Sequence, residues 1–272
     1  KMRGMRKLIF IGVIVLFFSC TSGDEVTRST EYSEYMLAVS IETGIDFMLK
    51  EIYTSNDVQI PELKLELRST EIYGCMNFGL ELSQFKNEQT LIIRFESIVE
   101  PGICLTAMGP ARTMVDLPLD VNKIIFINGN KLDEYDVSIN EEKVSFSAVS
   151  KSFTTSLYDD TFRLPKHSFA FVCGTNTDNT HIYDEFLSIL RENPAFEEFE
   201  FEGDGRIPYA ETSDGHWVNH PSKYFKYKEV SDFEKLAVVL NNFSSQHIKK
   251  NSGVSIALTS WDNRQYYSWV EN

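Results

Sequence analysis

Several side chains that can bind a metal ion or transfer protons occur within one stretch of the sequence, residues 203–223. This segment holds two of the five histidines, His216 and His220, and the carboxylate of Asp204. Two histidines four residues apart are a spacing that zinc sites use, and an aspartate can complete the ligand set. Loops longer than about 12–15 residues are uncommon unless they are functional or disordered. We therefore expect either a metal site formed by His216 and His220 with Asp204, or in the alternative Asp214, or a polar surface loop.

Aromatic side chains form a second set of candidate binding residues. Aromatic rings stack on sugars or clamp peptides because they offer a large apolar area with a defined geometry. The candidates are Tyr209, Trp217, Trp261, Tyr266 and Trp269. In the alternative interpretation, these rings cap the edge of a sheet and bind nothing.

Motifs of the common enzyme classes are absent from the sequence. It has no Gly-x-Ser-x-Gly nucleophile elbow, no P-loop, no dinucleotide-binding glycine fingerprint and no His-Glu-x-x-His motif. Cys173 with His167 or His181 would be a nucleophile and its base. Because residues 168–173 are an apolar run, the favoured interpretation of Cys173 is a buried thiol. We assign no catalytic residue and expect no cofactor.

The charge of the chain excludes some classes of partner. Lys and Arg number 26 against 40 Asp and Glu, which gives a formal net charge of −14. The four basic residues within the first seven positions contribute +4, so the rest of the chain carries about −18. Nucleic acids and anionic lipid surfaces both need clustered Lys and Arg. The sequence therefore predicts no nucleic-acid partner and no attachment to anionic lipid through charge.

The N-terminus has the composition of an export signal. A basic start is followed by an apolar run at residues 8–18 and a small residue at Ser19. The run is shorter than the roughly 20 residues that span a membrane. Residues Leu16-Phe17-Phe18-Ser19-Cys20 resemble the lipobox of bacterial lipoproteins, and this resemblance covers only this end of the chain.

The resemblance implies a lipid-anchored protein of the bacterial cell envelope. Residues 1–19 would be the signal peptide, and Cys20 would become the acylated N-terminus at the outer membrane, on its periplasmic or surface face. Stable anchoring then comes from acyl chains. Residues 20–34 are polar without an apolar period, which is typical of a flexible tether.

Three cysteines are left in what would be an oxidising compartment. Cys75 and Cys104 fall in the same part of the chain and are the candidate disulfide pair. Cysteine spacing alone does not fix a pairing. A bridge there would close a loop of about 30 residues and contribute about 3–4 kcal/mol in the chain-entropy model.

The first half of the body, residues 35–165, has the pattern of successive strands. Leu63, Leu65 and Leu67 alternate with charged residues, and Asn128-Gly129 is a strong hairpin signal. Alternation of period two with frequent turns favours an antiparallel β-sandwich of the immunoglobulin-like (Ig-like) type.

The second half, residues 166–272, mixes strands with helices. An apolar strand at 168–173 precedes a helical stripe that includes Ile182 and Phe186, and a second stripe begins at Phe233. The order strand, helix, strand, strand, helix, strand predicts a ferredoxin-like α/β two-layer domain. An open or three-layer α/β sheet is the alternative. The expected fold class is therefore α+β, a sandwich followed by this domain.

The favoured hypothesis for function is a non-enzymatic binding or adhesion-type module anchored in the cell envelope. Its expected partners are the membrane, through the lipid, and a protein, peptide or glycan. The alternative is a secreted-type hydrolase or metal-dependent enzyme that uses the 203–223 segment. A third hypothesis is a structural subunit of an assembly.

Overall fold

The computed structural model describes residues 31–271, and the chain divides into two units, Lys1–Tyr35 and Met36–Asn272. In the first unit, the described residues include a 3₁₀ turn at Ser33–Tyr35. The signal peptide at 1–19, the acylated Cys20 and the tether as far as residue 30 lie outside the described residues. Within residues 31–271, no helix has the length and hydropathy needed to cross a membrane.

Ten strands in the second unit form one mixed sheet. They are β1 (Ile45–Ile52), β2 (Glu62–Tyr73), β3 (Gly79–Asn87), β4 (Thr90–Val99), β5 (Gly109–Asp116), β6 (Lys123–Asn128), β7 (Lys131–Ile139), β8 (Lys143–Ser150), β9 (Thr154–Ser156) and β10 (Asp160–Phe162). Their spatial order is β10-β8-β7-β6-β4-β3-β5-β2-β1-β9. The pairs β1/β9, β3/β5 and β4/β6 are parallel, and the other neighbours are antiparallel.

Local sequence signals correctly placed several of these strands. Leu63, Leu65 and Leu67 point to one face of β2 and are buried, as the alternation predicted. The Asn128-Gly129 hairpin is also confirmed, since β6 and β7 pair from Asn128 and Lys131 outward. Gly129 adopts φ 63°, a conformation that a glycine tolerates without strain.

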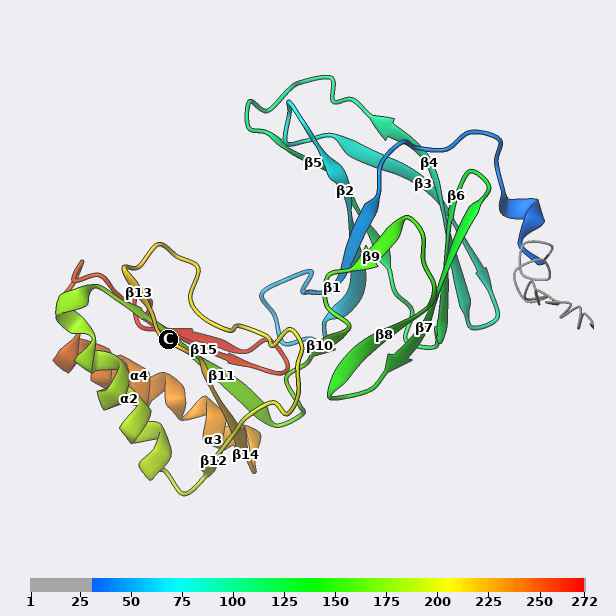
Figure 1. Ribbon diagram of the computed structural model, residues 1–272. Helices are drawn as coiled ribbons and strands as arrows, with labels where there is room; N and C mark the ends of the chain where they lie inside the picture. Colours follow the sequence, from blue (N-terminus) through cyan, green and yellow to red (C-terminus); the bar gives the residue numbers. More distant parts are fainter. Residues whose placement is uncertain (1–30, 272) are drawn as a thin grey trace, which may run out of the picture. The chain divides into compact units, whose positions relative to one another are not determined.

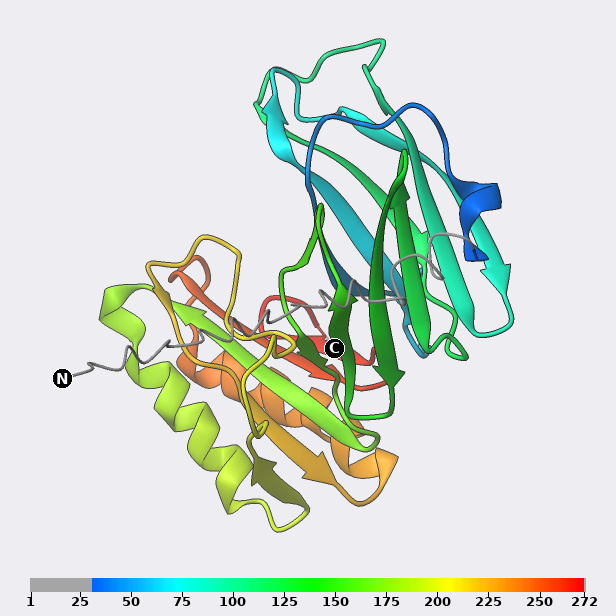
Figure 2. The same ribbon diagram turned by 45° about the vertical axis from the view of Figure 1, so that its right-hand side comes forward.

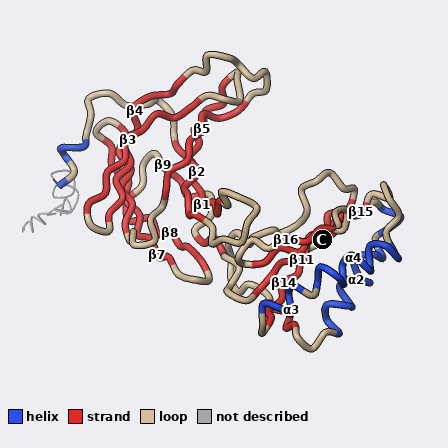
Figure 3. The backbone as a smooth tube through the Cα atoms, turned by 180° about the vertical axis from the view of Figure 1, so that it is seen from behind, coloured by secondary structure: helices blue, strands red, loops and turns tan. Residues whose placement is uncertain are grey.

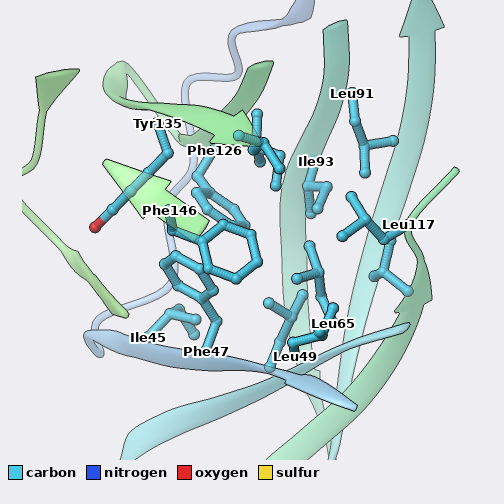
Figure 4. Packing of buried hydrophobic residues seen from close by; sticks show 14 of the residues in the cluster. Ile45, Phe47, Leu49, Leu65, Leu91, Ile93, Leu117, Phe126, Tyr135 and Phe146 are labelled. Atoms are coloured by element: carbon cyan, nitrogen blue, oxygen red, sulfur yellow. The ribbon is translucent and has the colours of Figure 1, made fainter. Parts of the chain in front are cut away.

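The core of the first sheet lies inside its curl. Phe47 from β1 packs against Phe126 and Tyr135, with ring centroids 5.0 Å apart in each pair. Leu65 from β2 and Ile93 from β4 point into the same cluster (Figure 4). One curled sheet therefore encloses this core, whereas the core of a β-sandwich lies between two separate sheets.

A second sheet of six strands follows. Its strands are β11 (Ser168–Thr175), β12 (Phe196–Phe199), β13 (Val218–Asn219), β14 (Lys223–Tyr227), β15 (Val254–Ser260) and β16 (Gln265–Tyr267). The spatial order is β12-β14-β11-β15-β16, with β13 paired to β11. The helices are α2 (His181–Glu192), α3 (Val230–Glu234) and α4 (Leu236–His247). Figures 1 and 3 show α2 and α4 along one face of this sheet.

Apolar side chains cover both faces of the second sheet. On β11, Phe171 and Cys173 join the core beneath the helices, whereas Ala170 and Val172 belong to a second cluster on the opposite face. Ile207, from the 203–223 segment, packs against that second cluster; the segment is the yellow connection between β12 and β14 in Figure 2. A strand that is buried on both faces is apolar throughout, which explains the unbroken run at the start of β11.

The fold class predicted from the sequence is wrong. Strands contain 44% of the described residues and helices 15%, so the protein is mostly β and not α+β. The Ig-like antiparallel sandwich is replaced by one curled mixed sheet with three parallel pairs. The ferredoxin-like two-layer domain is replaced by a six-stranded sheet with a cluster on each face, although the expected succession of strands and helices is present. Alternation of period two identifies strands but carries no information about their partners.

Candidate functional site

A cavity of about 580 Å³ lies where several distant segments of the second unit meet. Its walls come from the end of β1, the start of β2, the residues after β5, the connection between β10 and β11, and the residue after β15. We call this cavity the apolar cleft. Ligand pockets are usually concave, about 300–1000 Å³ in volume and mostly apolar, with a few polar groups. The apolar cleft meets these criteria and is the candidate functional site.

Apolar side chains make up most of the walls of the apolar cleft. The apolar lining consists of Tyr53, Ile60, Pro61, Leu63, Leu117, Pro118, Leu119, Leu164 and Trp261. The backbone N–H of Leu117 donates to the carbonyl of Leu63 at 2.8 Å, which fixes the segment after β5 to the start of β2. Ile60 and Leu119 are 65% and 69% exposed, so apolar groups are presented to solvent at this site.

One ion pair in the lining is largely buried. The Nε of Arg163 donates to Glu51 Oε1 at 2.7 Å, and another guanidinium nitrogen donates to the carbonyl of Asn140 at 3.1 Å. The side chains of Arg163 and Glu51 are only 14% and 19% exposed. Hydrogen bonds between ionised partners are short and directional. The pair therefore holds the β10–β11 connection against the end of β1.

The exposed charges of the apolar cleft also have opposite partners. Lys166 Nζ lies 2.5 Å from Glu141, and Lys64 Nζ lies 2.8 Å from Asp116 and 3.3 Å from Glu62. The hydrogen bond from Lys166 holds the pKa of Glu141 below its usual value. Each charged side chain in the lining therefore has an oppositely charged neighbour, and four carboxylates share three basic side chains because Lys64 is the partner of both Asp116 and Glu62.

A smaller cavity of about 160 Å³ adjoins the apolar cleft, and Glu51 and Tyr53 line both. Tyr209 lines only the smaller cavity, and the hydroxyl groups of Tyr53 and Tyr209 are hydrogen-bonded to each other. Burial, with a smaller effect of Glu51, raises the pKa of Tyr209 to about 12. Both tyrosines are therefore neutral at physiological pH.

The structure separates the five aromatic candidates. Trp261 lines the apolar cleft, where its indole N–H donates to the hydroxyl of Tyr227 at 3.0 Å, and Tyr209 lines the smaller cavity. Trp217 and Trp269 are 76% and 55% exposed. Tyr266 stacks on Phe233 at 5.1 Å within the core. The five rings form no common platform, and two of them contribute to the cavities.

The two histidines of the 203–223 segment lie on opposite faces of β11. A Cβ atom on Gly174 would come within 2.6 Å of the His216 ring, so His216 packs against the Gly174 face. His220 Nε2 lies 2.9 Å from Thr175 Oγ1, and successive residues of a strand face opposite sides. Asp204 is exposed beside Gly205, which contacts β10. Among residues 31–271, no three His, Cys, Asp or Glu side chains are grouped to hold a metal ion.

Cys173 is a buried free thiol. Its side chain is completely inaccessible within the helix-side core, and burial raises its pKa to about 12. The thiolate, which is the nucleophilic form, is therefore not populated at neutral pH. Its position matches the buried-thiol interpretation and gives no support to a nucleophile.

Sequence reasoning missed most residues of the apolar cleft. Glu51, Leu119 and Arg163 lie in segments far apart in the chain and belong to no motif. The available sequence signal for this site was a pair of prolines beside apolar residues and outside the strands. Pro61 follows Ile60 just before β2, and Pro118 lies between Leu117 and Leu119 just after β5. Such a signal is too common to identify a site by itself.

His220 should make the stability of the protein depend on pH. Burial, opposed by the nearby Asp184, lowers the pKa of His220 below its usual value of about 6.5. The unfolded state therefore binds the proton first, and the free energy of unfolding should fall as pH drops below about 6.5. Urea unfolding at pH 7.5 and 5.5 measures the effect. His220→Gln, which does not titrate, should show a smaller loss than wild type, and equal losses would contradict the prediction.

Comparison with known protein families, with curated proteins and with solved structures gives no match for this chain. The apolar cleft is therefore interpreted from its own geometry and chemistry.

Proposed function

We propose that this chain is a non-enzymatic binding protein of the bacterial cell envelope, anchored by lipid on Cys20, and that the apolar cleft is its binding site. The observation that carries the binding role is the cavity of about 580 Å³ with exposed aliphatic walls. Contiguous apolar surface that stays open to solvent typically marks an interaction site. The lipobox-like residues 16–20 support the anchor.

The lining favours a neutral apolar group as the ligand. A charged ligand would have to compete with existing pairs such as Arg163–Glu51, and breaking a largely buried pair leaves one charge uncompensated. Sugars are usually held by aromatic platforms with many available polar partners, whereas the charged side chains of the apolar cleft are already paired and seven of its nine apolar residues are Leu, Ile or Pro. Apolar side chains of a protein or peptide suit these walls better than a glycan does.

A neutral apolar dye tests the binding role. N-phenyl-1-naphthylamine, which fluoresces in apolar surroundings, should bind the chain from Glu31 onward, which contains both cores. Leu119→Asp should weaken binding about tenfold, because covering one leucine contributes about 1.5 kcal/mol. Leu119 is 69% exposed, so the substitution should leave the fold intact. A cooperative thermal unfolding transition of the variant, like that of wild type, verifies this.

Val238→Asp is the matched control for this experiment. Val238 is 62% exposed on α4 and lies outside both cavities. Its substitution adds the same charge and should not alter dye affinity. Equal affinities of wild type and Leu119→Asp would contradict the assignment of the apolar cleft as the binding site.

The lipid anchor has a separate test. When the full chain is expressed in a bacterium that processes lipoproteins, Cys20→Ser should abolish labelling by radioactive palmitate and reduce the membrane-bound fraction, because acyl chains supply the attachment. Cys173→Ser should keep both, since that thiol is buried. Palmitate labelling that persists in Cys20→Ser would refute the lipobox interpretation.

A further inference from the structure

A second exposed apolar feature lies at one end of the first sheet. It consists of residues 72–78 and 99–108, which we call the stapled tip. The large apolar side chains exposed there are Ile72, Met76, Val99, Ile103, Leu105 and Met108. Ile103 and Met108 are 81% and 73% exposed. Single exposed apolar residues are ordinary, but a group confined to two neighbouring loops typically marks an interaction surface.

The two loops of the stapled tip are fixed to each other. A disulfide joins Cys75 to Cys104, with a Cα–Cα distance of 5.3 Å. Asn77 donates from its amide nitrogen to the carbonyl of Ile103 at 2.7 Å and accepts from the N–H of Leu105 at 3.0 Å. The backbones of the two loops are therefore fixed to each other before any partner arrives, which lowers the entropy cost of binding.

The stapled tip is also nearly free of charge. Residues 101–111 contain no Asp, Glu, Lys or Arg, in a chain of which 24% is charged. Two copies of a protein with net charge −14 repel each other over most of their surfaces. This repulsion is reduced at the tip, which carries no charge apart from Glu100, and at the apolar cleft, where each carboxylate has a basic neighbour.

The stapled tip and the apolar cleft lie at opposite ends of the same strand pair. β2 and β5 are paired from Lys64 and Asp116, at the cleft, to Tyr73 and Gly109, at the tip (Figure 1). Nine residue steps along β2 correspond to about 30 Å. The tip therefore cannot enter the cleft of its own molecule, and a contact between the two features has to join separate copies.

We propose that the stapled tip of one copy inserts into the apolar cleft of the next, so that the protein associates head to tail. This inference rests on the proposed function, because it names the ligand of the cleft. The tip supplies several aliphatic side chains and no charge beyond Glu100 at its margin, while the charges of the cleft are already paired. Insertion leaves no unpaired charge buried, which is a requirement of stable interfaces.

The charge of the stapled tip argues for a second copy over a bilayer. Loops that enter membranes benefit from Lys and Arg near the headgroups, and the tip segments contain neither. Glu71 and Glu100 flank the apolar side chains and would be repelled by anionic lipids. In a head-to-tail contact the copy that supplies the tip is not the copy that receives the neighbour's tip, so the association extends into a chain or ring of copies.

Engineered disulfides in the full-length protein test the head-to-tail contact. The substitution Met108→Cys places a cysteine on the tip, and Leu119→Cys places one at the mouth of the cleft. Both positions are exposed, so a disulfide can form between two copies. In membranes treated with copper phenanthroline, the double variant should give a ladder of dimers and larger products on non-reducing gels. The two single variants, expressed together, should give dimers alone, because each carries only one half of the contact.

Two controls make this experiment decisive. Met108→Cys combined with Val238→Cys should give at least about fivefold less product than the combination with Leu119→Cys. Ile103→Asp, added to the double variant, should reduce the ladder by a similar factor, because its charge would be buried without a partner.

Several results would overturn the head-to-tail contact. Equal products with either partner cysteine would do so, and efficient dimers from Met108→Cys alone would show tip-to-tip contact instead. If the dye binds the cleft but no ladder forms, the head-to-tail contact is refuted while the binding role stands.

Discussion

Replacing Asp133 with alanine is expected to lower the free energy of unfolding by about 3–5 kcal/mol. Asp133, on β7, is fully buried and accepts five hydrogen bonds. They come from the backbone N–H groups of Ser152, Phe153 and Thr154 at 2.7–3.0 Å and from two hydroxyls at 2.6 and 2.8 Å. Removing the carboxylate leaves these donors without their acceptor, which is costly in a buried site.

The position of Asp133 explains the size of this effect. β9, which starts at Thr154, is one edge of the ten-stranded sheet, and β7 is third from the other edge. The hydroxyl of Tyr135, two residues along β7, also donates to the carbonyl of Thr154 at 3.0 Å. Asp133 and Tyr135 therefore connect the two sides of the sheet and hold it in its curled form.

Equilibrium unfolding in urea measures the effect of Asp133→Ala. Asp136→Ala, at an exposed position of the same strand, is the matched control and should change the free energy of unfolding by less than about 0.5 kcal/mol. Asp133→Asn should fall between the two, since its amide keeps one acceptor. A loss below about 1 kcal/mol for Asp133→Ala would show that the carboxylate does not hold the sheet closed.

Removing the disulfide is expected to have the next largest effect on stability. Cys75 and Cys104 are separated by 29 positions. In the chain-entropy model, opening a loop of this length costs about 3–4 kcal/mol, because the unfolded chain gains conformational freedom. The variant Cys75→Ser, Cys104→Ser should therefore unfold at a lower urea concentration than wild type.

A reducing agent provides the control for the disulfide variant. Wild type treated with dithiothreitol under unfolding conditions should reach the stability of the double serine variant, and the variant should not respond to the reductant. Equal stability of variant and oxidised wild type would contradict the prediction. The same variant should also give less ladder product in the crosslinking experiment, because the bridge holds Ile103 and its neighbours in place.

The sequence by itself determined those features that depend on neighbouring residues. Leu63, Leu65 and Leu67 are buried on one face of β2, and Gly129 forms the turn of a hairpin, as predicted. The helix with Ile182 and Phe186 is present with both side chains buried. The Cys75–Cys104 bridge is also present, but the sequence made these two residues only the candidate pair and the structure decided it. Alternation, turn propensity and helical spacing act over a few residues, so the sequence displays them directly.

Only the tertiary structure decided which strands are neighbours and where the site lies. β4 lies parallel to β6 and β1 parallel to β9, and no local pattern distinguishes these pairings from an antiparallel sandwich. The same limit applies to His216 and His220, whose spacing suggested one site until β13 placed them on opposite faces of β11. The apolar cleft exists because distant segments converge when both sheets fold, and such convergence depends on packing across the whole unit.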